Sequence, residues 1–167
     1  WTAARLGANS PVEMLARWLA SYPIALTVHT MGYAEAAGFA NFTRAVGQKI
    51  QVVGDDFLVT EAARIRAAAA QGVANTVLIK PNQRGTLTET KDAWEAARAC
   101  GYAGIVSARS GETEDVSIVH LAVGWGADQL KVGAFARSER MAKWNEALRI
   151  AETLGPDAYR GRDGIGR

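Results

Sequence analysis

The feature of this sequence that most constrains its fold is a regular alternation of short, apolar, β-prone runs with longer segments of helical character. The runs cover residues 24–28, 51–54, 76–79, 104–107 and 129–131. Units counted from Ile24, Gln51, Thr76, Ala103 and Asp128 are separated by 27, 25, 27 and 25 residues. A repeat of one strand and one helix predicts successive βα units with right-handed crossovers and a parallel sheet.

The segments between these runs carry helix signals. Residues 60–71 begin with Thr60, which we expect to be an N-cap, and residues 88–100 stop before a glycine. Residues 112–123 and 138–154 have similar character, and a further amphipathic helix is expected at 11–20. The segment 138–154 carries Met141, Trp144, Leu148 and Ala151 on one stripe.

Two α/β architectures fit this alternation: a doubly wound open sheet, or part of a (βα)₈ barrel. A complete barrel has eight strands and typically needs about 250 residues. The 167 residues present supply five candidate strands. The alternation alone therefore leaves both architectures open.

Composition narrows the class of protein. The 19 Lys and Arg residues nearly balance the 17 Asp and Glu residues, for a net charge of +2, and 49% of residues are hydrophobic. We therefore expect one domain over residues 1–167, with no nucleic-acid partner. Cys100 has no second cysteine to pair with, so we expect no disulfide. No apolar run reaches the length of about 20 residues that spans a bilayer, so we expect a soluble protein without a membrane partner.

Because the chain begins at Trp1 without a methionine or a signal peptide, we expect it to be cut from a longer protein.

Polar residues follow four of the five runs at the point where each strand should end. They are Asp55 and Asp56, then Lys80, then Ser107, Arg109 and Ser110, then Lys131. In parallel α/β folds the carboxyl ends of the strands meet at one edge, where ligands bind. Carboxylate, ammonium and guanidinium groups together suit a divalent cation and an anionic substrate, most plausibly a phosphate with a carboxylate. The alternative is that each is a solvated charge at a loop edge.

Four stretches carry a specific resemblance. They are VGDDFLVT at 53–60, LIKPNQRGTLTET at 78–90, SARSGETED at 107–115, and DQLKVGAFARSERMAKWNEALRIAETLG at 128–155. In motif and mutual spacing the chain resembles enolase (phosphopyruvate hydratase) over residues 12–162, specifically the second half of its barrel domain. The resemblance implies a partial TIM-type barrel of about five consecutive βα units, strands four to eight in the family's order, without the family's N-terminal domain and first barrel strands.

The resemblance also implies roles for individual residues. Lys80 would be the base that removes the C2 proton of 2-phosphoglycerate, and Asp55 would bind Mg²⁺. Among the implied substrate-binding residues, Arg109 and Ser110 would hold the phosphate, with Ser107 in the same run, and Lys131 would bind the carboxylate. The implied protein is a cytoplasmic, magnesium-dependent glycolytic lyase that acts on a small phosphorylated acid and can form a homo-oligomer.

Two positions depart from the family pattern. Gapless alignment puts Val28 where the family has a metal-binding Glu, beside His29, and Ala108 where it has a substrate-contacting His. Two interpretations therefore remain open. The chain belongs either to an enolase-like lyase, which interconverts 2-phosphoglycerate and phosphoenolpyruvate or performs altered chemistry on a phosphoenolpyruvate-like ligand, or to a catalytically inactive remnant or scaffold.

Overall fold

The computed structural model describes residues 9–28, 30, 36–159, 161 and 165, and in them five parallel strands form one sheet. The strands are β1 (Leu26–Val28), β2 (Gln51–Gly54), β3 (Thr76–Ile79), β4 (Ala103–Ser107) and β5 (Gln129–Lys131). They are hydrogen-bonded in sequence order, β1-β2-β3-β4-β5, and each pairs in parallel with the next. This confirms the predicted α/β fold, a partial TIM-type barrel, over the described part of the chain.

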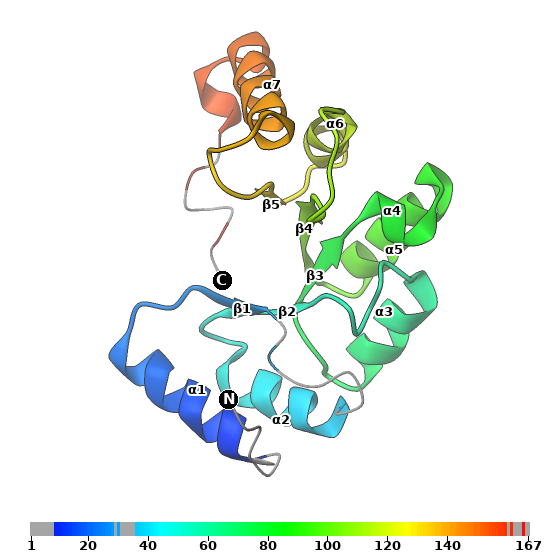
Figure 1. The fold of residues 1–167 in the computed structure, drawn as a ribbon. Helices are drawn as coiled ribbons and strands as arrows, with labels where there is room; N and C mark the ends of the chain where they lie inside the picture. The colour runs from blue at the N-terminus through cyan, green and yellow to red at the C-terminus, as the bar shows by residue number, and fades with distance from the viewer. Residues whose placement is uncertain (1–8, 29, 31–35, 160, 162–164, 166–167) are drawn as a thin grey trace.

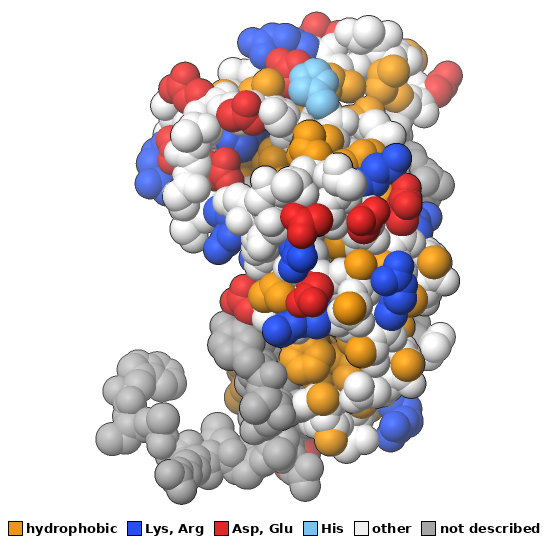
Figure 2. Space-filling view, turned by 90° about the vertical axis from the view of Figure 1, so that its right-hand side faces the viewer, with side chains coloured by type: hydrophobic (Ala, Val, Ile, Leu, Met, Phe, Trp, Pro, Cys, Tyr) orange, Lys and Arg blue, Asp and Glu red, His pale blue; other side chains and the backbone are white. Residues whose placement is uncertain are grey.

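The sheet curls, and the helices lie on its outer, convex side (Figure 1). The helices are α1 (Asn9–Ser21), α2 (Ala36–Val46), α3 (Ala62–Ala70), α4 (Pro81–Arg84), α5 (Leu87–Ala99), α6 (Ser117–Gly124) and α7 (Ser138–Leu154), followed by the short 3₁₀ helix η1 (Pro156–Ala158). In each βα unit the chain thus leaves a strand, passes through a helix on the outer side and returns to the sheet at the next strand, as right-handed crossovers require. Over the outer helical face, Lys and Arg are interspersed with Asp and Glu, and no large patch carries one sign of charge (Figure 2).

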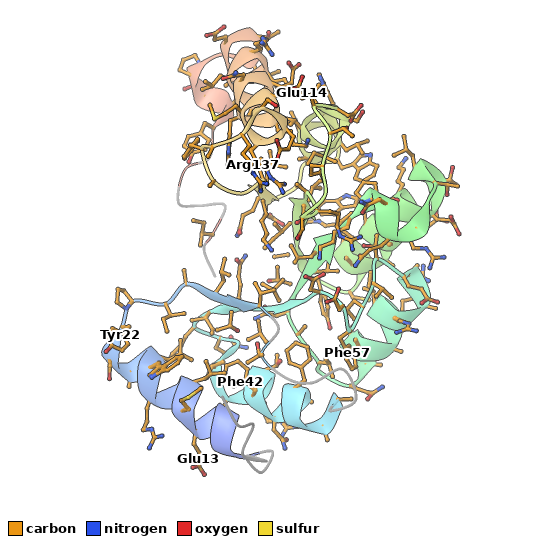
Figure 3. All side chains as sticks on the ribbon, in the orientation of Figure 1. Glu13, Tyr22, Phe42, Phe57, Glu114 and Arg137 are labelled. Carbon is orange, nitrogen blue, oxygen red and sulfur yellow. The ribbon has the colours of Figure 1, made fainter. Side chains whose placement is uncertain are left out.

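The main apolar core lies between the helices and the outer face of the sheet. Val52, Val77 and Val106 point from the strands into this layer and are fully buried. Phe42 of α2 is also fully buried, and it lies with Phe57 on the helical side of the sheet (Figure 3). Strand residues covered on both faces are expected to be apolar in succession, which explains the unbroken apolar runs in the sequence.

The inner, concave face of the sheet forms a second, smaller apolar cluster. Val53, Leu78 and Ile105 are buried there, and Leu26 and Val28 of β1 pack against them. A hollow of about 380 Å³ opens over this face, lined chiefly by residues of β1, β3, β4 and β5 and by Trp144 of α7. Side chains alternate between the two faces along each strand, so Leu78 faces the hollow while Val77 faces the helices.

Two helix predictions need correction, and one helix was not predicted. The helix expected from Thr60 begins at Ala62, and Thr60 is no N-cap, because its φ of 54° lies in the left-handed region and its hydroxyl bonds elsewhere. The helix expected over 112–123 begins at Ser117, because Glu112 is drawn into contacts of the preceding loop. Helix α2 was not predicted, although Phe39, Phe42 and Val46 provide a helical apolar spacing, since Gly38 and Thr43 lower the helix propensity of the segment.

Helix α7 has the predicted bounds, but the apolar stripe is not its buried face. Leu148 is 63% exposed, whereas Arg140 is only 7% exposed and Lys143 is fully buried. The helix therefore turns two cations toward the rest of the protein.

Replacing Thr86 with alanine is expected to lower the melting temperature by a few degrees. Thr86 caps α5: its Oγ1 accepts a hydrogen bond from the backbone N of Glu89 at 3.2 Å and donates one to the Glu89 carboxylate at 2.7 Å. The bond from Thr86, aided by Arg84, lowers the pKa of Glu89. The stability that the bond to the Glu89 carboxylate gives the folded state is therefore present above the ordinary carboxyl pKa. It is lost as the pH falls through the lowered pKa of Glu89.

Thermal unfolding at pH 7 and at acidic pH checks this prediction. The difference between the wild type and Thr86→Ala should shrink in acid, and Thr88→Ala, on the exposed side of the same turn, is the control. A difference that stays constant with pH would contradict a role for the Glu89 carboxylate.

Candidate functional site

Asp55 and Lys80 form a buried ion pair at the carboxyl ends of β2 and β3. The Lys80 ammonium donates a hydrogen bond to Asp55 Oδ1, and the two residues are only 7% and 4% exposed. Lys80 has extended backbone angles and follows Leu78 by two positions, so the alternation of the strand turns it to the inner face. The sheet thus brings together the predicted base and the predicted metal ligand.

Ser107 and Lys131 lie at the same edge, at the ends of β4 and β5. They are direct partners in the register between these strands, and the backbone N of Ala108 donates to the carbonyl of Lys131 at 2.9 Å. Ser107 is buried and its hydroxyl donates to the Ala108 carbonyl at 2.8 Å, whereas Lys131 is exposed. Since Ile79 pairs with Val106, Lys80 and Ser107 leave their strands at the same level.

Arg109 and Ser110 lie in the loop that follows β4. The Arg109 guanidinium donates to Asn82 Oδ1 at 3.1 Å, which links this loop to the beginning of α4. The side chain of Arg109 is half-buried, and Ser110 is exposed. All six predicted site residues therefore follow, or end, one of four adjacent parallel strands, and the carboxyl ends of such strands share one edge of a sheet.

Two residues that the sequence analysis did not assign to the site, Thr60 and Gln83, hold the loop around Lys80. The Thr60 hydroxyl accepts from the backbone N of Lys80 at 3.0 Å and donates to Gln83 Oε1 at 2.5 Å. Thr60 is fully buried in spite of its left-handed backbone. In the sequence, Thr60 is visible as the polar last residue of the stretch VGDDFLVT. Its distance along the chain from Lys80 does not predict a contact between them.

The matching family model is that of the enolase C-terminal TIM barrel domain, and it covers residues 3–166. The curated relative Enolase 1 of Desulfitobacterium hafniense (strain Y51) is 51% identical to this chain over 147 residues, which are 88% of this chain and 34% of that protein.

The chain belongs to the enolase family.

It spans about a third of the length of this enolase.

Val28 is the position at which the resemblance predicts a departure from the family's metal-binding Glu. Val28 pairs with Val53 in the sheet and packs into the apolar cluster of the inner face, where it lines the hollow. Its side chain offers no oxygen to a cation. His29 beside it lies outside the described residues.

Within the described ranges, no group of three or more His, Cys, Asp or Glu side chains could hold a metal ion. Asp55 supplies a carboxylate oxygen of the kind that Mg²⁺ prefers, but the same carboxylate accepts from Lys80. Among the predicted site residues of the described chain, Asp55 alone has a carboxylate. Mg²⁺ in proteins usually takes one or two carboxylates and completes its shell with water and substrate oxygens.

No helix in the described portion of the chain has the length and apolar character required to cross a membrane.

Proposed function

We propose that this chain forms the base, phosphate and carboxylate part of an enolase-type site that binds a small phosphorylated acid, 2-phosphoglycerate or phosphoenolpyruvate. The observation that carries the proposal is the buried Asp55–Lys80 pair at the same sheet edge as Arg109 and Lys131. One carboxylate and three cations at the same sheet edge suit a ligand with several negative charges.

Each residue has a role that its position supports. Lys80 takes the C2 proton of 2-phosphoglycerate as the neutral amine, since an ammonium has no lone pair to accept a proton, and its buried side chain stands at the carboxyl end of β3 beside the other site residues. Arg109 and Ser110 bind the phosphate, for which the planar guanidinium gives a two-point grip. Lys131 binds the carboxylate, and the Ser107 hydroxyl lies between Lys131 and Lys80 in the register of the strands.

Asp55 is the proposed Mg²⁺ ligand in this site. When bound, Mg²⁺ would supply positive charge that stabilises the doubly charged form of the substrate carboxylate. Lys131 contributes charge of the same sign from the protein itself. The reaction proposed for the whole protein is thus the lyase step of glycolysis, carried out in the cytoplasm, with altered chemistry on a phosphoenolpyruvate-like ligand as a variant of it.

We propose further that residues 1–167 act as one partial barrel domain of the enolase C-terminal type and that the protein works as a homo-oligomer. The second candidate function, a catalytically inactive remnant or scaffold, is favoured by Val28, whose apolar side chain occupies the inner face where the family carries a metal-binding carboxylate. Ala108 favours it too, because a methyl group cannot contact a substrate as an imidazole does.

Calorimetric titration with phosphoenolpyruvate is expected to separate these functions. Binding should be stronger with Mg²⁺ than without it, because the cation and the ligand complete one shell together. Arg109→Ala should weaken binding by roughly ten- to hundredfold, as expected for the loss of a hydrogen bond to a charged group. Arg66→Ala, which removes an exposed arginine of α3, is the matched control and should bind like the wild type.

Absence of heat at millimolar phosphoenolpyruvate, with and without Mg²⁺, would favour the inactive remnant. Equal affinities for wild type and Arg109→Ala would show that the ligand binds somewhere other than this site.

A further inference from the structure

The two cations that α7 turns inward lie against the loop that carries Arg109 and Ser110. Lys143 is fully buried, and its ammonium donates to the Thr113 carbonyl at 2.8 Å and to the Glu139 carbonyl at 3.1 Å. Its third partner is Glu112 Oε2, at 3.1 Å. An ammonium group has three donors, so these acceptors satisfy the buried charge.

The other oxygen of the Glu112 carboxylate reaches the backbone of the candidate phosphate-binding residue. Glu112 Oε1 accepts a hydrogen bond from the backbone N of Arg109 at 2.6 Å. One carboxylate thus joins the Lys143 ammonium on α7 to the main chain of Arg109. A charge-assisted bond of this kind is about twice as strong as one between neutral groups.

Arg140 holds Ser110, the residue after Arg109, through its backbone carbonyl. Its Nη2 donates to the Ser110 carbonyl at 3.0 Å, and its Nη1 donates to the Val132 carbonyl at 2.9 Å. The guanidinium therefore ties the loop after β4 to the residue that follows Lys131. Gly133, next to Val132, has a φ of 116°, which favours glycine, and a Cβ there would lie in ordinary van der Waals contact with Arg140 Cδ, at 3.5 Å.

We infer that Glu112, held by Lys143, is a positioning residue that fixes the Arg109–Ser110 backbone for a phosphorylated ligand, with Arg140 as its counterpart on Ser110. This inference rests on the proposed function. The same loop is also held by the bond from Arg109 to Asn82, by the bond from the Ala108 backbone N to the Lys131 carbonyl, and by its own turn, in which Asp115 accepts from the backbone N of Ser117. When a loop is ordered before the ligand binds, no binding energy is lost in ordering it. The contacts of Glu112 and Arg140 therefore raise the affinity without touching the ligand.

The test compares substitutions of Glu112 by phosphoenolpyruvate titration with Mg²⁺ and by amide hydrogen exchange at Arg109, on the full chain. Glu112→Ala removes both bonds and should weaken phosphoenolpyruvate binding by roughly tenfold or more and speed exchange of the Arg109 amide. Glu112→Gln keeps an oxygen that can accept from that amide and should restore a large part of the affinity. Glu146→Gln is the matched control, because Glu146 of α7 pairs with the exposed side chains of His120 on α6 and Arg149 on α7 and not with the loop.

The outcomes separate the inference from the proposed function. A folded Glu112→Ala that binds phosphoenolpyruvate like the wild type, while Arg109→Ala has lost binding, overturns the positioning role and leaves the proposed function standing. No binding by the wild type overturns the proposed function and the inference together.

Should Glu112→Ala fail to fold, Glu112→Asp takes its place. It keeps the charge for Lys143 but is too short to reach the Arg109 amide as well. Weaker binding with an unchanged melting temperature then supports the positioning role, and unchanged binding overturns it.

Discussion

Gly104→Ala is expected to destabilise the chain by about 1–3 kcal/mol, the usual cost of adding a methyl group to a filled core. A Cβ at Gly104 of β4 would lie 1.9 Å from Cζ3 and 2.7 Å from Cη2 of the Trp94 ring, which is itself only 5% exposed. The indole ring is rigid and packed between α5 and the sheet, so it cannot move away without disturbing other core residues.

Urea unfolding measures this effect. Gly124→Ala, at the end of α6, is the control, because its added Cβ would meet nothing within 4 Å. In a Trp94→Leu background the cost of Gly104→Ala should fall, since the smaller side chain leaves room for the methyl group. Equal costs in both backgrounds would rule out the close approach of Gly104 to Trp94 as the cause.

Asp55→Leu is expected to cost about 3–5 kcal/mol, because it leaves the buried ammonium of Lys80 without its carboxylate partner. The double variant Asp55→Leu/Lys80→Met should recover much of this loss, since two apolar side chains of similar size need no charge compensation. The free energy of unfolding of the wild type, both single variants and the double variant gives the coupling energy of the pair.

The exposed pair Lys91–Glu95, 3.5 Å apart on α5, is the reference. Its removal by Glu95→Ala should change stability by less than about 1 kcal/mol. If the double variant is stable and yet does not bind phosphoenolpyruvate, the ion pair is needed for ligand binding and not for folding. If the double variant is no more stable than Asp55→Leu, the buried charge is not what destabilises the single variant.

Much of the fold could be predicted from the sequence because strand positions depend on a local signal. The apolar runs at 51–54, 76–79 and 129–131 match β2, β3 and β5 at both ends, and the helix stop at Gly155 is marked by a glycine and a proline. Helix starts were less predictable. Thr60 has the right type for an N-cap, but a contact with Lys80, twenty positions away in the chain, decides its conformation.

The surroundings of the candidate site were the least predictable part. The types and strand positions of Asp55, Lys80, Arg109 and Lys131 are visible in the sequence, and their placement at one edge follows from the parallel topology. Charged residues on a helix are ordinarily assigned to solvent, so Arg140 and Lys143 were overlooked in favour of the apolar residues beside them. Only three-dimensional packing reveals that their partners include carbonyl groups of a loop some 30 positions earlier.

The alternation of side chains along the strands limits how such a protein can change length. Leu78 and Lys80 share the concave face, while Val77 and Ile79 face the helices. One residue inserted or deleted within Thr76–Ile79 would swing Lys80 around to the helical layer and bring an apolar side chain to the ligand edge in its place. Evolution can therefore exchange side chains in these strands and lengthen the loops between units, but the spacing inside each strand must stay in steps of two.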